Sequence, residues 1–231
     1  MCRKGERIEN GRRSKLRYNT LRIKTWLYLQ ANHRRSGLNK ELGRKHPLHR
    51  IVGQCISSYR FPSCKIIKDP ACGGQQNIPL FCSKDKSNRT EYCNVDLLIL
   101  EDSKIRVIIE IEETDITPTQ ICGKFLTSAL SSYFIHESKN NNPIRMSDSV
   151  SFIQIVNTSR LEEGTAKPDQ WKNLEKSIRK ILPIEGSRIR RYKLLYGNVS
   201  GFKGKHRNKC TELITYIKRH FGKDRTSNNE A

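Results

Sequence analysis

The sequence has few long apolar stretches, and this shortage limits what the protein can be. No run approaches the roughly 18 consecutive apolar residues that a membrane-spanning helix requires. The N-terminus also lacks the apolar core of a secretory signal peptide. We therefore expect a soluble, cytoplasmic protein without a membrane partner.

Several motifs with a defined chemistry are missing as well. The chain has no glycine-rich nucleotide-binding fingerprint, no internal repeat, and no motif of a serine or cysteine nucleophile. None of its eight cysteines is spaced C-x₂-C, the usual pattern of a zinc site. Small, reduced and buried cysteines are therefore expected in a cytoplasmic chain. The alternative is a Zn²⁺ site made of Cys64, Cys72, Cys82 and Cys93 with His46 or His49.

Acidic residues are scarce, because 44 Lys and Arg residues face 23 Asp and Glu residues, for a net charge of +21. Residues 1–50 carry a net charge of +12 and residues 151–231 carry +10, whereas residues 101–150 carry −3. Such an excess favours a polyanionic partner, most simply double-stranded DNA, with an anionic membrane surface as the rival. The side chains that we expect to contact DNA are Lys84, Lys86, Arg89, Lys203, Lys205 and Arg207.

The length of 231 residues fits one domain with basic extensions. We expect a basic arm at 1–20, a single folded domain at 21–221, and a disordered tail at 222–231. Apolar periodicity and capping residues predict an α/β fold, whose central mixed sheet is flanked by helices. Helices are predicted at Thr20–Asn32, Leu38–Tyr59, Pro118 to about His136, Pro168–Leu182 and Thr211–Phe221, and strands at Lys65–Lys68, Leu80–Cys82, Val95–Leu100, Ile105–Ile111, Val150–Val156 and Arg188–Tyr196.

The two strands at the centre of this pattern form an antiparallel hairpin. With a three-residue loop at 102–104, the register places Asp96 directly opposite Glu110. Glu112 lies two residues further along and shares their face. A two- or four-residue loop would instead pair Asp96 with Ile109 and mix the two faces. The next parallel strand of the sheet follows after a crossover helix.

Between Asp96 and Asp115 lie seven acidic and two basic residues, although the chain as a whole is strongly basic. Carboxylates directly across two strands repel each other. A divalent cation between them removes this repulsion, and oxygen ligands suit Mg²⁺, with Mn²⁺ as a substitute. The alternative interpretation is a solvated acidic hairpin with salt bridges to neighbouring basic residues.

Asp96, followed after a hairpin by Glu110-Ile111-Glu112, resembles the metal-binding motif of the PD-(D/E)XK nuclease superfamily. The resemblance covers about twenty residues. Two positions depart from the family pattern: Asn94-Val95 precede the aspartate where the family name has proline, and Glu112 stands where the family has lysine. A minority of restriction enzymes also carry a second glutamate at that position.

The resemblance implies a restriction-endonuclease-like fold and a role for each motif residue. Asp96 and Glu110 are the expected metal ligands, together with the backbone carbonyl of Ile111, and Glu112 is the third catalytic residue. In this superfamily a glutamate from an N-terminal helix often joins the metal site, which makes Glu41 a further candidate. Gln120 and Lys124 on the following helix are possible accessory residues, and Lys124 could replace the missing motif lysine; ordinary surface exposure is its alternative.

Together these observations predict a Mg²⁺-dependent DNA endonuclease that leaves 5′-phosphate and 3′-hydroxyl ends. The resemblance makes a type II restriction enzyme acting as a homodimer the first expectation. The alternatives are a repair or mobile-element nuclease of the same superfamily, and a non-catalytic nucleic-acid-binding protein, with or without structural zinc.

Overall fold

The computed structural model describes residues 46–114, 117–136, 142–203 and 208–227, with side chains as far as Phe221. The chain divides into two units, Met1–Glu41 and Leu42–Ala231, and all described residues belong to the second unit. The predicted arm at 1–20, the predicted helix at Thr20–Asn32 and the candidate ligand Glu41 lie outside the described residues. Among the described helices, none is both long and apolar enough to cross a membrane.

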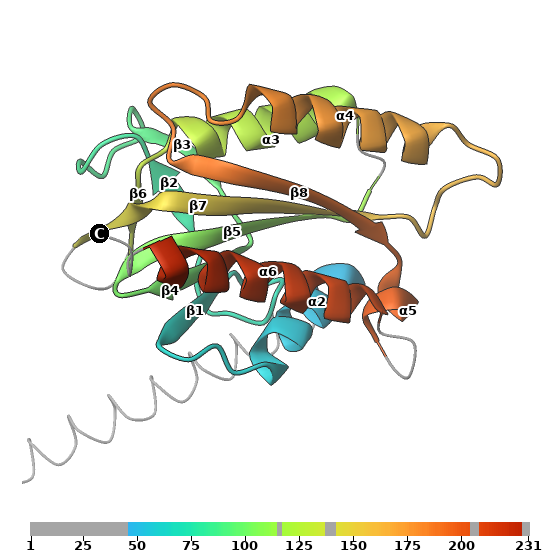
Figure 1. The fold of residues 1–231 in the computed structure, drawn as a ribbon, viewed down its shortest axis with the longest axis horizontal. Coiled ribbons are helices and arrows are strands. Elements are labelled where there is room, and N and C mark those ends of the chain that lie inside the picture. Colours follow the sequence, from blue (N-terminus) through green and yellow to red (C-terminus); the bar gives the residue numbers. More distant parts are fainter. Residues whose placement is uncertain (1–45, 115–116, 137–141, 204–207, 228–231) are drawn as a thin grey trace, which may run out of the picture. The chain divides into compact units, whose positions relative to one another are not determined.

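Eight strands and five helices make up the described part of the chain (Figure 1). The α/β architecture with a mixed central sheet, which the apolar pattern predicts, is confirmed. In chain order the elements are α2 (Pro47–Ser58), β1 (Cys64–Lys68), β2 (Pro79–Phe81), β3 (Glu91–Asn94), β4 (Leu97–Glu101), β5 (Lys104–Glu112), α3 (Pro118–Leu130), β6 (Tyr133–Ile135), β7 (Pro143–Asn157), α4 (Lys167–Ile181), β8 (Ile189–Gly197), α5 (Val199–Phe202) and α6 (Asn208–Ser227).

The sheet is built around β5, which pairs antiparallel with β4 and parallel with β7. The strand order is β1-β4-β5-β7-β6-β2-β3. On the side away from β5, the 15-residue strand β7 pairs with two further strands, one after the other along its length. Its first residues pair antiparallel with β6, and its second half pairs parallel with β8. The sheet therefore branches at β7, and the crossover through α3 makes β5 and β7 parallel, as the sequence predicts.

Helices cover both faces of the sheet, with α3 and α4 on one face and α2, α5 and α6 on the other (Figure 1). Each face has its own apolar cluster, because successive strand residues point to opposite sides. Ile108, for example, packs with α3 and α4, whereas Ile109 packs with α2 and α6. Alternation along the hairpin predicts one apolar face of six residues. Five of them lie on the α2 and α6 side, namely Leu97, Ile99, Val107, Ile109 and Ile111, whereas Val95 packs in the cluster on the α3 and α4 side.

The turn of the β4–β5 hairpin is shorter than predicted. Glu101 pairs with Lys104, so the loop consists of Asp102 and Ser103 alone. Both loop residues have positive φ, 49° and 59°. This conformation is that of a two-residue turn whose twist matches the twist of the flanking strands. The strand twist therefore favours this loop over the predicted three-residue loop at 102–104.

A bulge next to Ile99 compensates for the shorter turn. One extra residue on β5 shifts the pairing, so that Leu97 lies opposite Ile109. This is the register that the three-residue loop predicts, and one step further it aligns Asp96 with Glu110. The expected alignment of the two carboxylates is therefore present, but a bulge produces it and not the loop length.

Other predicted elements differ at their ends. The helix that begins at Pro118 stops at Leu130, well before His136, because β6 follows and pairs with β2 and β7. The C-terminal helix α6 continues to Ser227, so the tail predicted to be disordered from Gly222 is helical for its first six residues. Strand β3 has no counterpart in the sequence prediction, since its four residues have no periodic apolar pattern.

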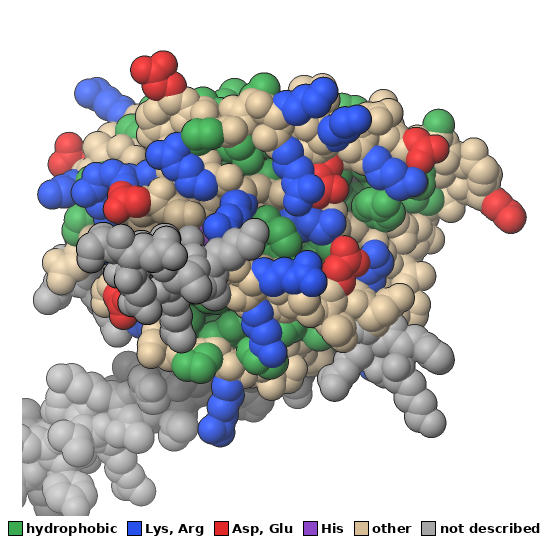
Figure 2. All heavy atoms as spheres, in the orientation of Figure 1, with side chains coloured by type: hydrophobic (Ala, Val, Ile, Leu, Met, Phe, Trp, Pro, Cys, Tyr) green, Lys and Arg blue, Asp and Glu red, His purple; other side chains and the backbone are tan. Residues whose placement is uncertain are grey.

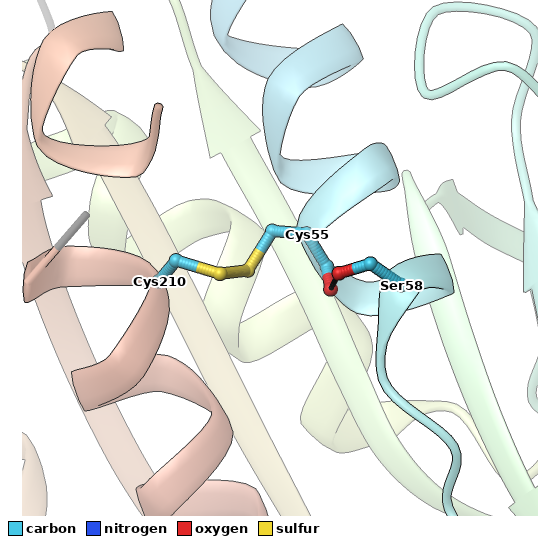
Figure 3. The surroundings of a disulfide bond; sticks show 3 residues. All are labelled: Cys55, Ser58 and Cys210. Atoms are coloured by element: carbon cyan, nitrogen blue, oxygen red, sulfur yellow. Dashed lines mark hydrogen bonds between the residues drawn. A yellow bond between two sulfur atoms is a disulfide. The ribbon is translucent and has the colours of Figure 1, made fainter. Parts of the chain in front are cut away.

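Cys55 on α2 and Cys210 on α6 form a disulfide (Figure 3). The expectation of reduced cysteines is therefore wrong for this pair. Both residues pack in the cluster on the α2 and α6 face, where the two helices lie against the sheet. They are 155 positions apart in the sequence, so nothing local to either cysteine signals the pairing. Cys72, Cys82, Cys93 and Cys122 are free thiols.

We predict that removing this disulfide destabilises the fold. A bond that closes so long a loop restricts the unfolded chain, and losing such a bond costs about 2–5 kcal/mol. Denaturant unfolding of Cys55→Ser, compared with the wild type, measures the loss of unfolding free energy. The matched control is Cys82→Ser, which removes a free, half-buried thiol and should change stability by less than about 1 kcal/mol. Equal stabilities of the wild type and Cys55→Ser would contradict the prediction.

Candidate active site

The predicted carboxylates meet where β4 begins and β5 ends. Asp96 directly precedes β4, and its Oδ2 accepts a hydrogen bond of 2.6 Å from the backbone N–H of Ile111. Glu110 lies on the neighbouring strand, close enough to Asp96 for the negative charge of Asp96 to act on its carboxyl group. The hairpin register brings the two side chains together, since Asp96 continues the pairing of β4 beyond Leu97.

Glu110 is almost fully buried, with 1% of its surface exposed. Burial raises the pKa of Glu110 well above its ordinary value, and the negative charge of Asp96 raises it further. Burial also acts to raise the pKa of Asp96, but hydrogen bonds with His49 and with the Ile111 N–H outweigh it and lower that pKa. The two pKa values are therefore shifted in opposite directions, and Glu110 is the member of the pair that takes up a proton more readily.

Lys124 enters this site from α3. Its Nζ lies 2.6 Å from Glu112 Oε1 and 3.6 Å from Glu110 Oε2. Burial by itself lowers the pKa of Lys124, but the charges of Glu110 and Glu112 raise it above the ordinary lysine value. Of the two interpretations of Lys124 drawn from the sequence, the structure favours the one that places it at the acidic face.

Gln120, the second predicted accessory residue, has a different role in the structure. Its Oε1 accepts a hydrogen bond from the backbone N–H of Thr117 at 2.8 Å, while its own N–H donates to Thr117 Oγ1. The two residues form a capping box at the start of α3. Gln120 therefore caps the start of α3, and its described hydrogen bonds are with Thr117 and not with the acidic residues.

The sequence does not predict that His49 lies beside the candidate catalytic carboxylates. Its ring lies between two carboxylates, with Nε2 3.5 Å from Asp96 Oδ1 and Nδ1 3.2 Å from Glu113 Oε1. The sequence carries only a faint signal of this role, namely a histidine in the first turn of a helix that begins with Pro47. The contact with Asp96 joins segments 47 positions apart, and no local pattern encodes it.

Glu113 caps the N-terminus of α2, although it is distant from that helix in the sequence. Its Oε1 accepts hydrogen bonds from the backbone N–H groups of Leu48, at 2.6 Å, and His49, at 3.1 Å. The helix N-terminus attracts this carboxylate because its first N–H groups have no partner within the helix. Oε2 of Glu113 accepts a further bond from Asn157 Nδ2 at 2.9 Å. Glu113 thus faces α2, whereas Glu112 faces Lys124 on α3, because successive residues of a strand point to opposite faces.

The cysteines do not gather into the alternative zinc site. Within the described residues, the one group of three or more His, Cys, Asp or Glu side chains whose ligand atoms lie within 4.8 Å of one another is His46, His49 and Glu113. Cys72 is buried beside Asp69, whereas Cys82 and Cys93 belong to the β2–β3 region.

The basic residues predicted to contact DNA have mixed outcomes. Lys84, Lys86 and Arg89 are exposed in the segment between β2 and β3, and Lys203 is exposed after α5. Lys205 and Arg207 lie outside the described residues. Before this gap, Val199–Phe202 form the short helix α5.

No protein-family model, curated protein or solved structure matches this chain. The interpretation of the site therefore depends on its geometry and on the chemistry of its residues.

We predict that His49 is protonated at neutral pH in the folded protein when no metal ion is bound. Burial acts to lower its pKa, but the hydrogen bonds and charges of Asp96 and Glu113 raise it from 6.5 to about 9. The stabilisation that this pairing contributes is complete below pH 6.5, decreases as the pH rises, and is lost above about pH 9. Its full size is on the order of 3 kcal/mol. An NMR titration of the imidazole in EDTA and denaturant unfolding at several pH values measure these quantities.

The control variant is His49→Gln, which keeps a polar side chain but removes the titrating ring. Its unfolding free energy should change less with pH between 6.5 and 9 than that of the wild type. A wild-type imidazole that titrates near 6.5 would contradict the prediction.

Proposed function

We propose that this protein is a Mg²⁺-dependent DNA endonuclease, and that it acts as a sequence-specific homodimer of the type II restriction class. The observation that carries the proposal is the state of Glu110. Its Oε1 is buried and has no hydrogen-bond partner among the described residues, although it belongs to a carboxyl group beside a second carboxylate. Buried polar atoms are rarely left without a partner, and those that are often mark a site for a missing ion or ligand.

The donor atoms around Glu110 suit a hard divalent cation. Asp96 Oδ1, Glu110 Oε1 and the backbone carbonyl of Ile111 are oxygen ligands, the type that Mg²⁺ and Mn²⁺ prefer. The hydrogen bond from the Ile111 N–H fixes the other oxygen of Asp96, which orients the carboxylate before any ion binds. When bound, a divalent ion at such a site supplies a water of lowered pKa and neutralises charge on a phosphodiester.

Lys124 supplies the cation that the motif lacks at position 112. Its ammonium group lies between Glu110 and Glu112, and 41% of its side chain is exposed. It is therefore held beside the carboxylates and still faces solvent, where a phosphate group could approach. In this arrangement Glu112 positions the ammonium group, and Lys124 stabilises the negative charge that develops on the phosphate.

Positive charge elsewhere on the molecule supports a polyanionic substrate. Lys and Arg side chains are numerous on the face that carries α4, β8 and α6 (Figure 2). A cavity of about 780 Å³ on this face is lined by Arg179, Arg190, Arg191, Lys193 and Arg219, with Glu212 as the acidic residue. Such a surface attracts nucleic acid through phosphate contacts and the release of counterions.

The proposal predicts plasmid cleavage that depends on Mg²⁺ and on both buried carboxyl groups. The wild-type protein should produce discrete fragments with Mg²⁺ and none with EDTA. Asp96→Asn and Glu110→Gln should each reduce the rate by about 100-fold or more, because each removes a charged ligand of the ion. The control is Asp169→Asn, which changes an exposed carboxylate on α4. Normal cleavage by both site variants would overturn the proposal.

Lys124→Ala tests the role of the ammonium group separately. Loss of one preorganised charge at the reacting centre should lower the cleavage rate on the order of 100-fold, with little change in DNA affinity measured in EDTA. Lys104→Ala, which removes an exposed lysine next to the turn of the β4–β5 hairpin, should cleave at the wild-type rate. If Lys124→Ala also cleaves at that rate, Lys124 has no catalytic role.

The same assays distinguish the narrower alternatives. A repair or mobile-element nuclease would cut branched DNA in preference to linear duplex and would leave no discrete fragment pattern. A non-catalytic binding protein would bind DNA equally well with and without Mg²⁺ and would cleave none of these substrates.

A further inference from the structure

His46, His49 and Glu113 bring three metal-binding side chains together next to the acidic cluster. Each offers one ligand atom, and these atoms lie within 4.8 Å of one another. The two histidines are three residues apart at the start of α2, a spacing that places both rings on one side of the helix. Their ring centroids are 5.3 Å apart. Glu113 reaches them from the residue directly after β5.

The carboxylate of this group is held in place by the surrounding backbone. Two N–H groups of α2 and the amide of Asn157 donate hydrogen bonds to Glu113. Partners of this kind orient a metal ligand and reduce the cost of ordering it when an ion binds. Helix capping alone explains these bonds. Support for a metal site therefore comes from the hydrogen bonding of the two histidine rings.

His46 provides the observation that capping does not explain. Its Nδ1 is buried and has no hydrogen-bond partner among the described residues. The ring of His49, in contrast, is engaged by Asp96 and Glu113. A helix cap with an ion pair needs no second imidazole, and leaving a ring nitrogen buried without a partner is unfavourable. A cation bound between His46 and Glu113 would give this nitrogen a partner.

We propose that His46, His49 and Glu113 form a second cation site, one for a transition-metal ion of the Zn²⁺ type. Two imidazole nitrogens and one carboxylate oxygen suit Zn²⁺ and Co²⁺ better than Mg²⁺, which prefers oxygen ligands alone. Three protein ligands leave at least one coordination position for water or a further ligand. The bound ion would fasten the first turn of α2 to the end of β5, two segments that are distant in the sequence.

This site differs from the acidic site in its ligands and does not require the proposed nuclease activity. Glu110→Gln should abolish cleavage without affecting the metal of the histidine site. His46→Ala should remove that metal and leave the carboxyl groups of Asp96 and Glu110 unchanged. The two proposals can therefore fail separately.

Metal binding by the full-length protein tests the inference. The protein is stripped with a chelator, dialysed, and titrated with Zn²⁺ or Co²⁺, with the bound metal measured by elemental analysis. We expect the wild type to bind one more equivalent than His46→Ala, and His136→Ala, which changes a histidine outside the group, to match the wild type. The thermal midpoint of the wild type should also rise with Zn²⁺ concentration, whereas that of His46→Ala should rise less.

The absorption spectrum of bound Co²⁺ identifies the ligands even if a variant folds poorly. Nitrogen and oxygen ligands give the weak visible bands of Co²⁺ without a thiolate-to-metal charge-transfer band. A strong charge-transfer band from the wild type would assign the metal to cysteines and overturn the proposal. Equal metal content in the wild type and a folded His46→Ala would overturn it as well. His46→Gln, which keeps a polar side chain, should behave as His46→Ala does.

Discussion

The arrangement of this site depends on placing two carboxyl groups side by side at a buried end of the sheet. An unpaired buried charge is costly, and two like charges in contact are more costly still. Burial raises the pKa of Glu110, which favours its neutral form, and cationic side chains approach the pair from two directions. Lys124 comes from α3 on one face of the sheet, and His49 comes from α2 on the other. Helices α2 and α3, on opposite faces of the sheet, thus both contact the carboxyl pair of the hairpin.

Strand geometry explains why the neighbouring residues Glu112 and Glu113 contact different helices. Successive side chains of a strand point to opposite faces. Glu112 therefore pairs with Lys124, whereas Glu113 receives the N-terminal N–H groups of α2. Two adjacent carboxylates in this way anchor two helices. One of these contacts belongs to the proposed catalytic group, and the other orients the segment that carries His49.

The proposed nuclease chemistry and the proposed transition-metal site use ligands of different kind. The acidic group offers oxygen atoms, which suit Mg²⁺, and the histidine group offers mainly nitrogen atoms. His49 is common to both surroundings, since its two ring nitrogens face Asp96 and Glu113. The disulfide between α2 and α6 adds a covalent restraint to the helix that carries this residue.

Much of the fold follows from local patterns in the sequence. Apolar runs rich in Val, Ile and Leu predict β4, β5 and β7, and Thr117-Pro118 predict the start of α3, because strand periodicity and helix capping are properties of neighbouring residues. Alternation along the hairpin also places Asp96, Glu110 and Glu112 on a common face. The exact turn does not follow in this way, since the bulge next to Ile99 depends on how both strands twist and pair.

The remaining features of the site were decided by tertiary structure. The contact of Lys124 with Glu110 requires α3 to pack across the sheet, and the disulfide joins cysteines on two distant helices. His49 is near Asp96 only because α2 lies against the other face, and Glu113 caps that helix only because β5 ends beside it. By itself the sequence determined which strands carry carboxylates, because that pattern is local. Only the folded chain decided which cations meet them, because those contacts join residues that no short-range pattern connects.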